Sequence, residues 1–172
     1  ELCLVGSEMC IRDSSLEINS FSNINDINEK VGFLEIIKCH DISSGILNPT
    51  NSDYVIENLD FAIDTCVKKM GFGLVTGPIS KENIIEGGYS FSGHTERIMQ
   101  KTNSDNVLML LASERLKVAL ATTHMPISKV PESITKELIF NKVKILNQEL
   151  KEKFNIENPK ISLLGLNPHA GE

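Results

Sequence analysis

The sequence lacks any long uninterrupted run of apolar residues. No stretch approaches the roughly 18 apolar residues that a membrane-spanning helix needs. No charged start followed by an apolar run and a small-residue cleavage site is present either. We therefore expect no membrane partner and a cytoplasmic location.

An excess of basic residues is also missing. The 172 residues include 17 Lys and Arg against 23 Asp and Glu, which gives a formal net charge of -6. A broad electrostatic surface for nucleic acid is not supported by this balance. An anionic substrate would have to be held by a local site.

Paired cysteines of the C-x-x-C type do not occur, so neither a zinc knuckle nor a thioredoxin-type motif is indicated. In a reducing compartment, thiols of this kind are mostly buried or idle, and we expect no disulfide framework. The four cysteines are Cys3, Cys10, Cys39 and Cys66.

The glycine fingerprint of dinucleotide-binding folds is incomplete. Residues 71–77 contain G-x-G, but Thr76 stands where the third glycine is required. These glycines also precede a predicted strand, whereas the fingerprint places them between a strand and the following helix. If the protein uses a nicotinamide cofactor, it does so without this motif.

Segments with strand and helix patterns alternate from residue 31 onward, and 41% hydrophobic content is enough for a core. This order predicts an α/β fold with a mixed, mostly parallel sheet flanked by helices. The short link between two of the strands, residues 107–112 and 116–122, predicts that they pair antiparallel. The other predicted strands are 31–37, 73–76 and 161–166. A helix is predicted with Asn51 or Ser52 as its cap and Gly71 as its stop. Further helices are predicted at 82–86, ended by Gly87 and Gly88, at 94–101, and at 135–154, capped by Thr135.

The N-terminal region follows neither pattern. Residues 1–14 are similar to the translated read-through of a sequencing adapter, and residues 15–30 are typical of an exposed connection with little order. We assign residues 31–90 to part of a first α/β domain and residues 91–172 to the start of a second.

Two histidines follow predicted strands. His124 comes after strand 116–122 and His169 after strand 161–166. The carboxyl ends of strands in one open sheet gather ligands, and two neutral imidazoles suit a divalent transition metal. Each histidine is equally compatible with an ordinary hydrogen-bonded loop residue.

A third polar cluster begins the helix at residues 94–101. Free backbone N–H groups at such a start favour an anion, so His94 and Thr95 are candidate phosphate contacts. Alternatively, Ser92 or Thr95 caps the helix. Lys81 is a candidate anion contact or an ordinary surface lysine.

Four motifs, taken in order, resemble the 4-hydroxythreonine-4-phosphate dehydrogenase family of pyridoxal phosphate biosynthesis. The resemblance extends over residues 31–172. The motifs lie at residues 75–81, 91–96, 118–124 and 165–172.

The resemblance implies an NAD-dependent oxidation of 4-phosphooxy-L-threonine at its secondary alcohol. The resulting β-keto acid would lose carbon dioxide and give 3-amino-2-oxopropyl phosphate. It also implies a homodimer with the isocitrate and isopropylmalate dehydrogenase type of fold, incomplete in this chain.

Residue by residue, the resemblance makes His94 and Thr95 substrate contacts, and it makes His124 and His169 two of three ligands to a divalent metal. The third ligand would lie beyond Glu172. Zinc, cobalt or magnesium would polarise the substrate hydroxyl and lower its pKa.

Members of the family are roughly twice as long, so the resemblance predicts an inactive internal fragment. Two alternatives stay open. A D-threonate or D-erythronate 4-phosphate dehydrogenase of the same family shares the motifs, and a phosphate acyltransferase has a similar two-lobed form but no use for a histidine metal site.

Overall fold

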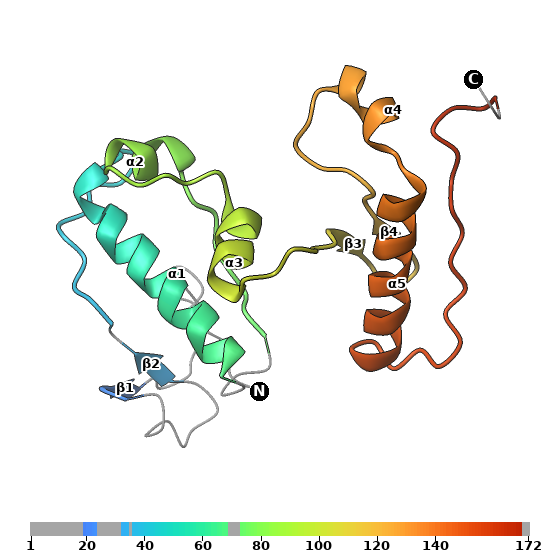
Figure 1. Ribbon diagram of the computed structural model, residues 1–172. Helices are drawn as coiled ribbons and strands as arrows, with labels where there is room; N and C mark the ends of the chain where they lie inside the picture. Colours follow the sequence, from blue (N-terminus) through green and yellow to red (C-terminus); the bar gives the residue numbers. More distant parts are fainter. Residues whose placement is uncertain (1–18, 24–31, 35, 69–72, 170–172) are drawn as a thin grey trace. The chain divides into compact units, whose positions relative to one another are not determined.

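The computed structural model describes residues 19–23, 32–34, 36–68 and 73–169, so the prediction for residues 1–14 lies outside it. The chain divides into two compact units, residues 1–104 and 105–172 (Figure 1). None of the described helices combines the length and apolar composition that crossing a bilayer requires. Helices and short strands are both present, as the sequence pattern indicated.

The first unit begins with two short strands, β1 (Asn19–Phe21) and β2 (Gly32–Leu34), which pair in parallel. β2 lies within the predicted strand 31–37. β1 lies inside the segment that we expected to have little order, so that expectation is wrong for residues 19–21, because their backbone is paired with β2.

Helix α1 (Ser52–Val67) forms the centre of the first unit. A 3-10 helix, Pro49–Asn51, precedes it, and the side chain of Asn48 accepts the hydrogen bond from Thr50 N at its start. The helical region therefore begins slightly before the predicted caps Asn51 and Ser52, because proline fits the first turn of a helix. The predicted stop at Gly71 lies outside the described residues.

Helices α2 (Lys81–Glu86) and α3 (His94–Thr102) complete this unit and match the predicted helices 82–86 and 94–101. Gly87 ends α2, as predicted, and lies so close to α1 that a Cβ there would come within 2.1 Å of Ser52 Oγ. One apolar core joins the three helices. Its buried members are Ile56, Leu59, Ile63, Ile84 and Phe91.

The predicted strand 73–76 does not form. Residues 73–80 have no strand assignment, and the Val75 side chain is 65% exposed. A strand requires a neighbour that accepts and donates its backbone hydrogen bonds. Among the described residues, no segment pairs with 73–76.

The second unit contains a hairpin of β3 (Leu110–Ala112) and β4 (Lys117–Ala119). The strands pair antiparallel, as predicted, with Leu111 opposite Val118. They are shorter than the predicted 107–112 and 116–122. The link is closed by Ser113, whose Oγ accepts a hydrogen bond from Leu116 N at 3.1 Å.

Helix α5 (Lys136–Glu152) packs beside the hairpin and matches the predicted helix 135–154. Thr135 caps it as predicted, since its Oγ1 accepts from Leu138 N at 3.1 Å. A short helix, α4 (Val130–Ser133), precedes it and was not predicted.

The predicted strand 161–166 is also absent, and Leu163 and Leu164 are 67% and 86% exposed. The described residues hold two separate two-stranded sheets in place of the single, mostly parallel sheet expected. A continuous apolar run marks a segment that can be buried, but a sheet forms only where partner strands are present.

Candidate functional site

The N-terminus of α3 is fixed to the core of the first unit. Phe91, two residues before the N-cap Gly93, is buried against α1 and α2. Gly93 is itself buried. The first turn of α3, which starts with His94 and Thr95, is therefore held in place by the packing of the segment before it.

The His94 imidazole is part-buried and contains a buried polar atom without a partner. Its Nε2 atom is inaccessible to solvent and has no hydrogen bond among the described residues. The ring meets the Phe91 ring edge to face, with centroids 6.0 Å apart. A buried polar atom without a partner costs about 1–3 kcal/mol, so it calls for an explanation.

The charge of His94 follows from its surroundings. Burial lowers the pKa of the imidazole below its usual value, and the positive charge of Lys81 lowers it further. The ring is therefore neutral at pH 7 and has one nitrogen that donates and one that accepts.

Capping does not account for this cluster. No side chain makes a capping hydrogen bond at the start of α3, so neither Ser92 nor Thr95 occupies the free N–H groups. The sequence left capping and anion binding open, and the structure decides against a side-chain cap. The N–H groups of the first turn remain available to an anion.

Lys81 is brought to the same place from α2. Ser80 caps α2, with Ser80 Oγ accepting from Asn83 N, and this fixes Lys81 as the first helical residue. A Cβ on Gly93 would lie 3.5 Å from Lys81 Nζ. Two candidate residues that are distant in the sequence, Lys81 and His94, therefore lie at one site.

An ion-pair network that sequence reasoning missed holds α3 on α1. Arg97 donates two hydrogen bonds to Asp60, at 2.8 and 2.6 Å, and Lys101 lies within 3.5 Å of Asp60 and 3.3 Å of Asp64. The sequence did hold a signal. Asp60 and Asp64 are spaced four apart on α1, as Arg97 and Lys101 are on α3, so each pair lies on one helix face.

His124 lies in the second unit, five residues after β4 ends at Ala119. Its side chain is exposed, and its backbone φ is 53°. This left-handed conformation is uncommon for a residue other than glycine, and such residues are concentrated at functional sites. The described residues give its imidazole no hydrogen-bond partner.

His169 is exposed as well, and its backbone N–H donates to Asn167 Oδ1 at 2.8 Å. This short turn fixes the backbone that carries the imidazole. Within residues 19–23, 32–34, 36–68 and 73–169, no group of three or more His, Cys, Asp or Glu side chains could hold a metal ion. The two histidines therefore offer two imidazole donors in one unit, and their role as ligands stays a prediction.

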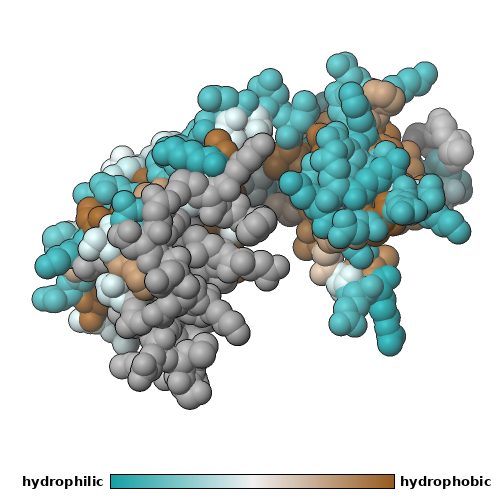
Figure 2. Space-filling view, turned by 90° about the horizontal axis from the view of Figure 1, so that it is seen from below, coloured by the Kyte–Doolittle hydropathy of each residue, from teal (hydrophilic) through white to brown (hydrophobic). Residues whose placement is uncertain are grey.

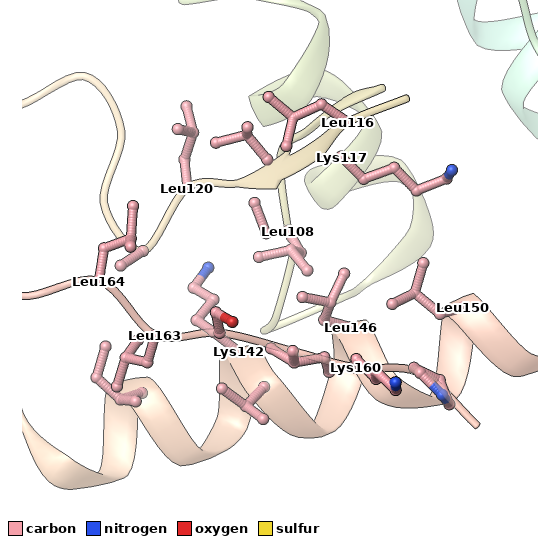
Figure 3. Close-up of a pocket in the computed structure, with 18 of the residues that line it drawn as sticks. Leu108, Leu116, Lys117, Leu120, Lys142, Leu146, Leu150, Lys160, Leu163 and Leu164 are labelled. Carbon is pink, nitrogen blue, oxygen red and sulfur yellow. The ribbon is translucent and has the colours of Figure 1, made fainter. Parts of the chain in front are cut away.

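A separate apolar groove of about 610 Å³ lies in the second unit (Figure 3). It opens between the hairpin, α5 and the extended segment 159–164, and neither His124 nor His169 lines it. Hydrophobic residues are also visible on the surface of this unit (Figure 2). The labelled apolar side chains of the groove are Leu108, Leu116, Leu120, Leu146, Leu150, Leu163 and Leu164.

Comparison with known proteins identifies the family. The chain matches the family described as "Pyridoxal phosphate biosynthetic protein PdxA" over residues 1–172. A 4-hydroxythreonine-4-phosphate dehydrogenase of Serratia proteamaculans is 44% identical over 139 residues, which are 81% of this chain and 42% of that protein.

Solved structures give the same result. A 4-hydroxythreonine-4-phosphate dehydrogenase from Burkholderia phymatum superposes with a TM-score of 0.76 at 27% identity, covering 91% of this chain and 48% of that one. The enzyme of the same name from Klebsiella pneumoniae superposes with a TM-score of 0.80 at 20% identity, covering 98% of this chain and 54% of that one. At this identity the match shows a likeness of fold. This chain thus spans about half the length of the proteins it resembles or less. It belongs to the PdxA family of pyridoxal phosphate biosynthetic proteins.

Proposed function

We propose that this chain carries part of the active site of an NAD-dependent dehydrogenase that oxidises 4-phosphooxy-L-threonine at its secondary alcohol. The alcohol gives up a hydride to NAD and a proton, and the β-keto acid formed then loses carbon dioxide to give 3-amino-2-oxopropyl phosphate. Family membership supports this reaction. The observation that carries it is the buried, unpartnered His94 Nε2 at the uncapped start of α3.

The substrate is held at the start of α3. The neutral His94 imidazole can donate to or accept from a substrate oxygen, and Thr95 adds a hydroxyl in the same turn. The backbone N–H groups of this turn attract the negative charge of the substrate. The Nε2 atom of His94 is shielded from solvent, and a hydrogen bond in such surroundings is stronger than one in water.

The metal site includes His124 and His169. Their donor chemistry fits a divalent ion such as zinc or cobalt, since both imidazoles are exposed and neither has a hydrogen-bond partner in the described part of the chain. Magnesium fits this donor set less well because it prefers oxygen. When bound, the ion lowers the pKa of the substrate hydroxyl and the nicotinamide accepts the hydride.

The same proposal includes the fold and the oligomeric state of the whole protein. We expect the whole protein to have the isocitrate and isopropylmalate dehydrogenase type of α/β fold and to form a homodimer in the cytoplasm. In that fold, segments 73–76 and 161–166 would gain partner strands. The assignment of residues 31–90 and 91–172 to two domains stays a prediction, although residues 91–104 here lie in the first compact unit, because α3 packs on α1.

The test is substrate oxidation by the whole protein, followed as NADH formation. We expect turnover of 4-phosphooxy-L-threonine with release of carbon dioxide. Turnover of D-threonate or D-erythronate 4-phosphate in its place would assign the protein to the other activity of the family. No NAD reduction with any of the three phosphate esters would contradict the proposed function.

Replacement of His94 tests the site itself. His94→Ala should reduce kcat/KM for the phosphate ester by about 10- to 100-fold, because a hydrogen bond to a charged group is lost. His40→Ala is a matched control, since His40 is exposed and contacts Asn51 through its backbone. Equal losses in the two variants would show that the effect is not specific to the site.

A further inference from the structure

The Lys81 side chain extends from α2 to the start of α3. The residue begins α2, yet its ammonium group lies over the start of α3, 3.5 Å from where a Cβ of Gly93 would be. In the part of the chain that the structure describes, Lys81 forms no ion pair. A lysine held beside a helix start without a carboxylate partner has positive charge available for a ligand.

Three further observations meet at this point. The first turn of α3 has no side-chain cap. His94 Nε2 is buried without a partner. Glycine at position 93 keeps the space between the two helices open, because a Cβ there would lie 2.8 Å from Glu96 Oε2 as well as 3.5 Å from Lys81 Nζ. The Lys81 ammonium group, the uncapped first turn of α3 and the His94 side chain therefore belong to one part of the first unit.

We propose that Lys81 is a substrate-binding residue, whose ammonium group binds the phosphate of the substrate together with the N–H groups of the first turn of α3 and His94 Nε2. This inference rests on the proposed function, because that function supplies the phosphate ester. Phosphate is favoured over a carboxylate since it offers three acceptor oxygens to the lysine, the imidazole and the backbone N–H groups, one more than a carboxylate has.

Glu96 gives the proposal a second, opposite test. Its carboxylate oxygen lies at the same point above Gly93. A bound phosphate would be repelled by this carboxylate, so the side chain must turn away when the ligand binds. Removal of the Glu96 charge should therefore strengthen phosphate binding, while removal of the Lys81 charge weakens it.

The experiment titrates inorganic phosphate into the protein and follows the amide signals of Gly93, His94 and Thr95 by NMR. Lys81→Met should weaken phosphate binding by about 10- to 100-fold, and Lys81→Arg should retain most of it. Glu96→Gln should tighten binding several-fold. Lys144→Met removes an exposed charge from α5 and should change nothing. A carboxylate ligand is tested with 4-hydroxy-L-threonine, which should not compete with phosphate.

Two further readouts separate binding from a structural role. Burial and the positive charge of Lys81 both lower the pKa of His94. Glu96 is a further charged residue at this end of α3. The His94 pKa should therefore rise in Lys81→Met. In the whole enzyme, the variant should raise KM more than it lowers kcat.

Unchanged phosphate affinity in both Lys81→Met and Glu96→Gln would overturn the proposal, and so would competition by 4-hydroxy-L-threonine at equal strength. If Lys81→Met fails to fold, the phosphate affinities of Lys81→Arg and Glu96→Gln still test the proposal. Phosphate binding that depends on Lys81, without NAD reduction, would leave this site standing and remove the proposed function.

Discussion

His124 holds a backbone conformation that most residues avoid. At φ 53° the Cβ of any L-residue crowds the following carbonyl oxygen, at a cost of roughly 1–2 kcal/mol. Nothing in the hairpin or α5 requires a histidine there, since its side chain is exposed. The strain is therefore better explained by the placement of the imidazole than by folding.

This explanation predicts opposite effects on stability and binding. His124→Gly should be about 1 kcal/mol more stable than His124→Ala, because glycine adopts this conformation without strain. Both variants should lose the metal. The free energy of unfolding, measured in urea, gives the first comparison, and metal analysis gives the second.

His169 supplies the control. Its φ is not among the positive values of the described residues, so His169→Gly should be no more stable than His169→Ala. If glycine stabilises position 169 as much as position 124, the difference does not come from the left-handed backbone.

At the scale of elements, the contact between α1 and α3 depends on Asp60. Burial alone would raise the pKa of its carboxyl, but the hydrogen bonds and charge of Arg97, together with Lys101, outweigh burial and hold the pKa below its usual value. The carboxylate therefore contributes stability above the unfolded-state pKa of about 3.9. That contribution is lost as the pH falls through the lower, folded-state pKa.

Asp60→Asn should lower the free energy of unfolding at pH 7 by about 1–2 kcal/mol, a discounted value because the pair is part-exposed. The difference between the variant and the wild type should shrink as the pH falls below about 4. Urea unfolding over a pH series measures it. Glu132→Gln, in the exposed pair with Lys129, should change stability by less than about 0.5 kcal/mol. A pH-independent loss in Asp60→Asn would contradict the ion-pair account.

Helices α1, α2, α3 and α5 were predicted because their signals are local, whereas the short helix α4 was not predicted. Ser80 and Thr135 cap α2 and α5 through hydrogen bonds to residues three positions ahead, and apolar spacing marks the buried faces. The strands at 73–76 and 161–166 were predicted from apolar runs alone. Their formation depends on partners far along the chain, which a local pattern does not contain.

At the scale of the whole molecule, the candidate residues fall into two groups. Lys81, His94 and Thr95 belong to the first compact unit, and His124 and His169 to the second. We therefore expect that the proposed substrate contacts and the proposed metal ligands can be removed separately.

In the whole protein, His124→Ala should reduce the bound divalent metal to well below one ion per chain, while phosphate binding at α3 persists. Mutation of a residue that only hydrogen-bonds to a metal ligand lowers metal affinity by about 10- to 100-fold. Loss of a histidine ligand itself should lower the affinity by at least as much. Metal analysis after dialysis measures the first effect and NMR titration the second. A wild-type protein without divalent metal would contradict the proposed metal site.

The sequence by itself determined the family, helices α1, α2, α3 and α5, and the residue types at both candidate sites, because these depend on short motifs and local hydrogen bonding. Only the tertiary structure decided that Lys81 lies beside His94, that no side chain caps α3, and that Asp60 and Arg97 join two helices. These features need residues from separate helices to meet, and the core around Ile84 and Phe91 is what brings them together.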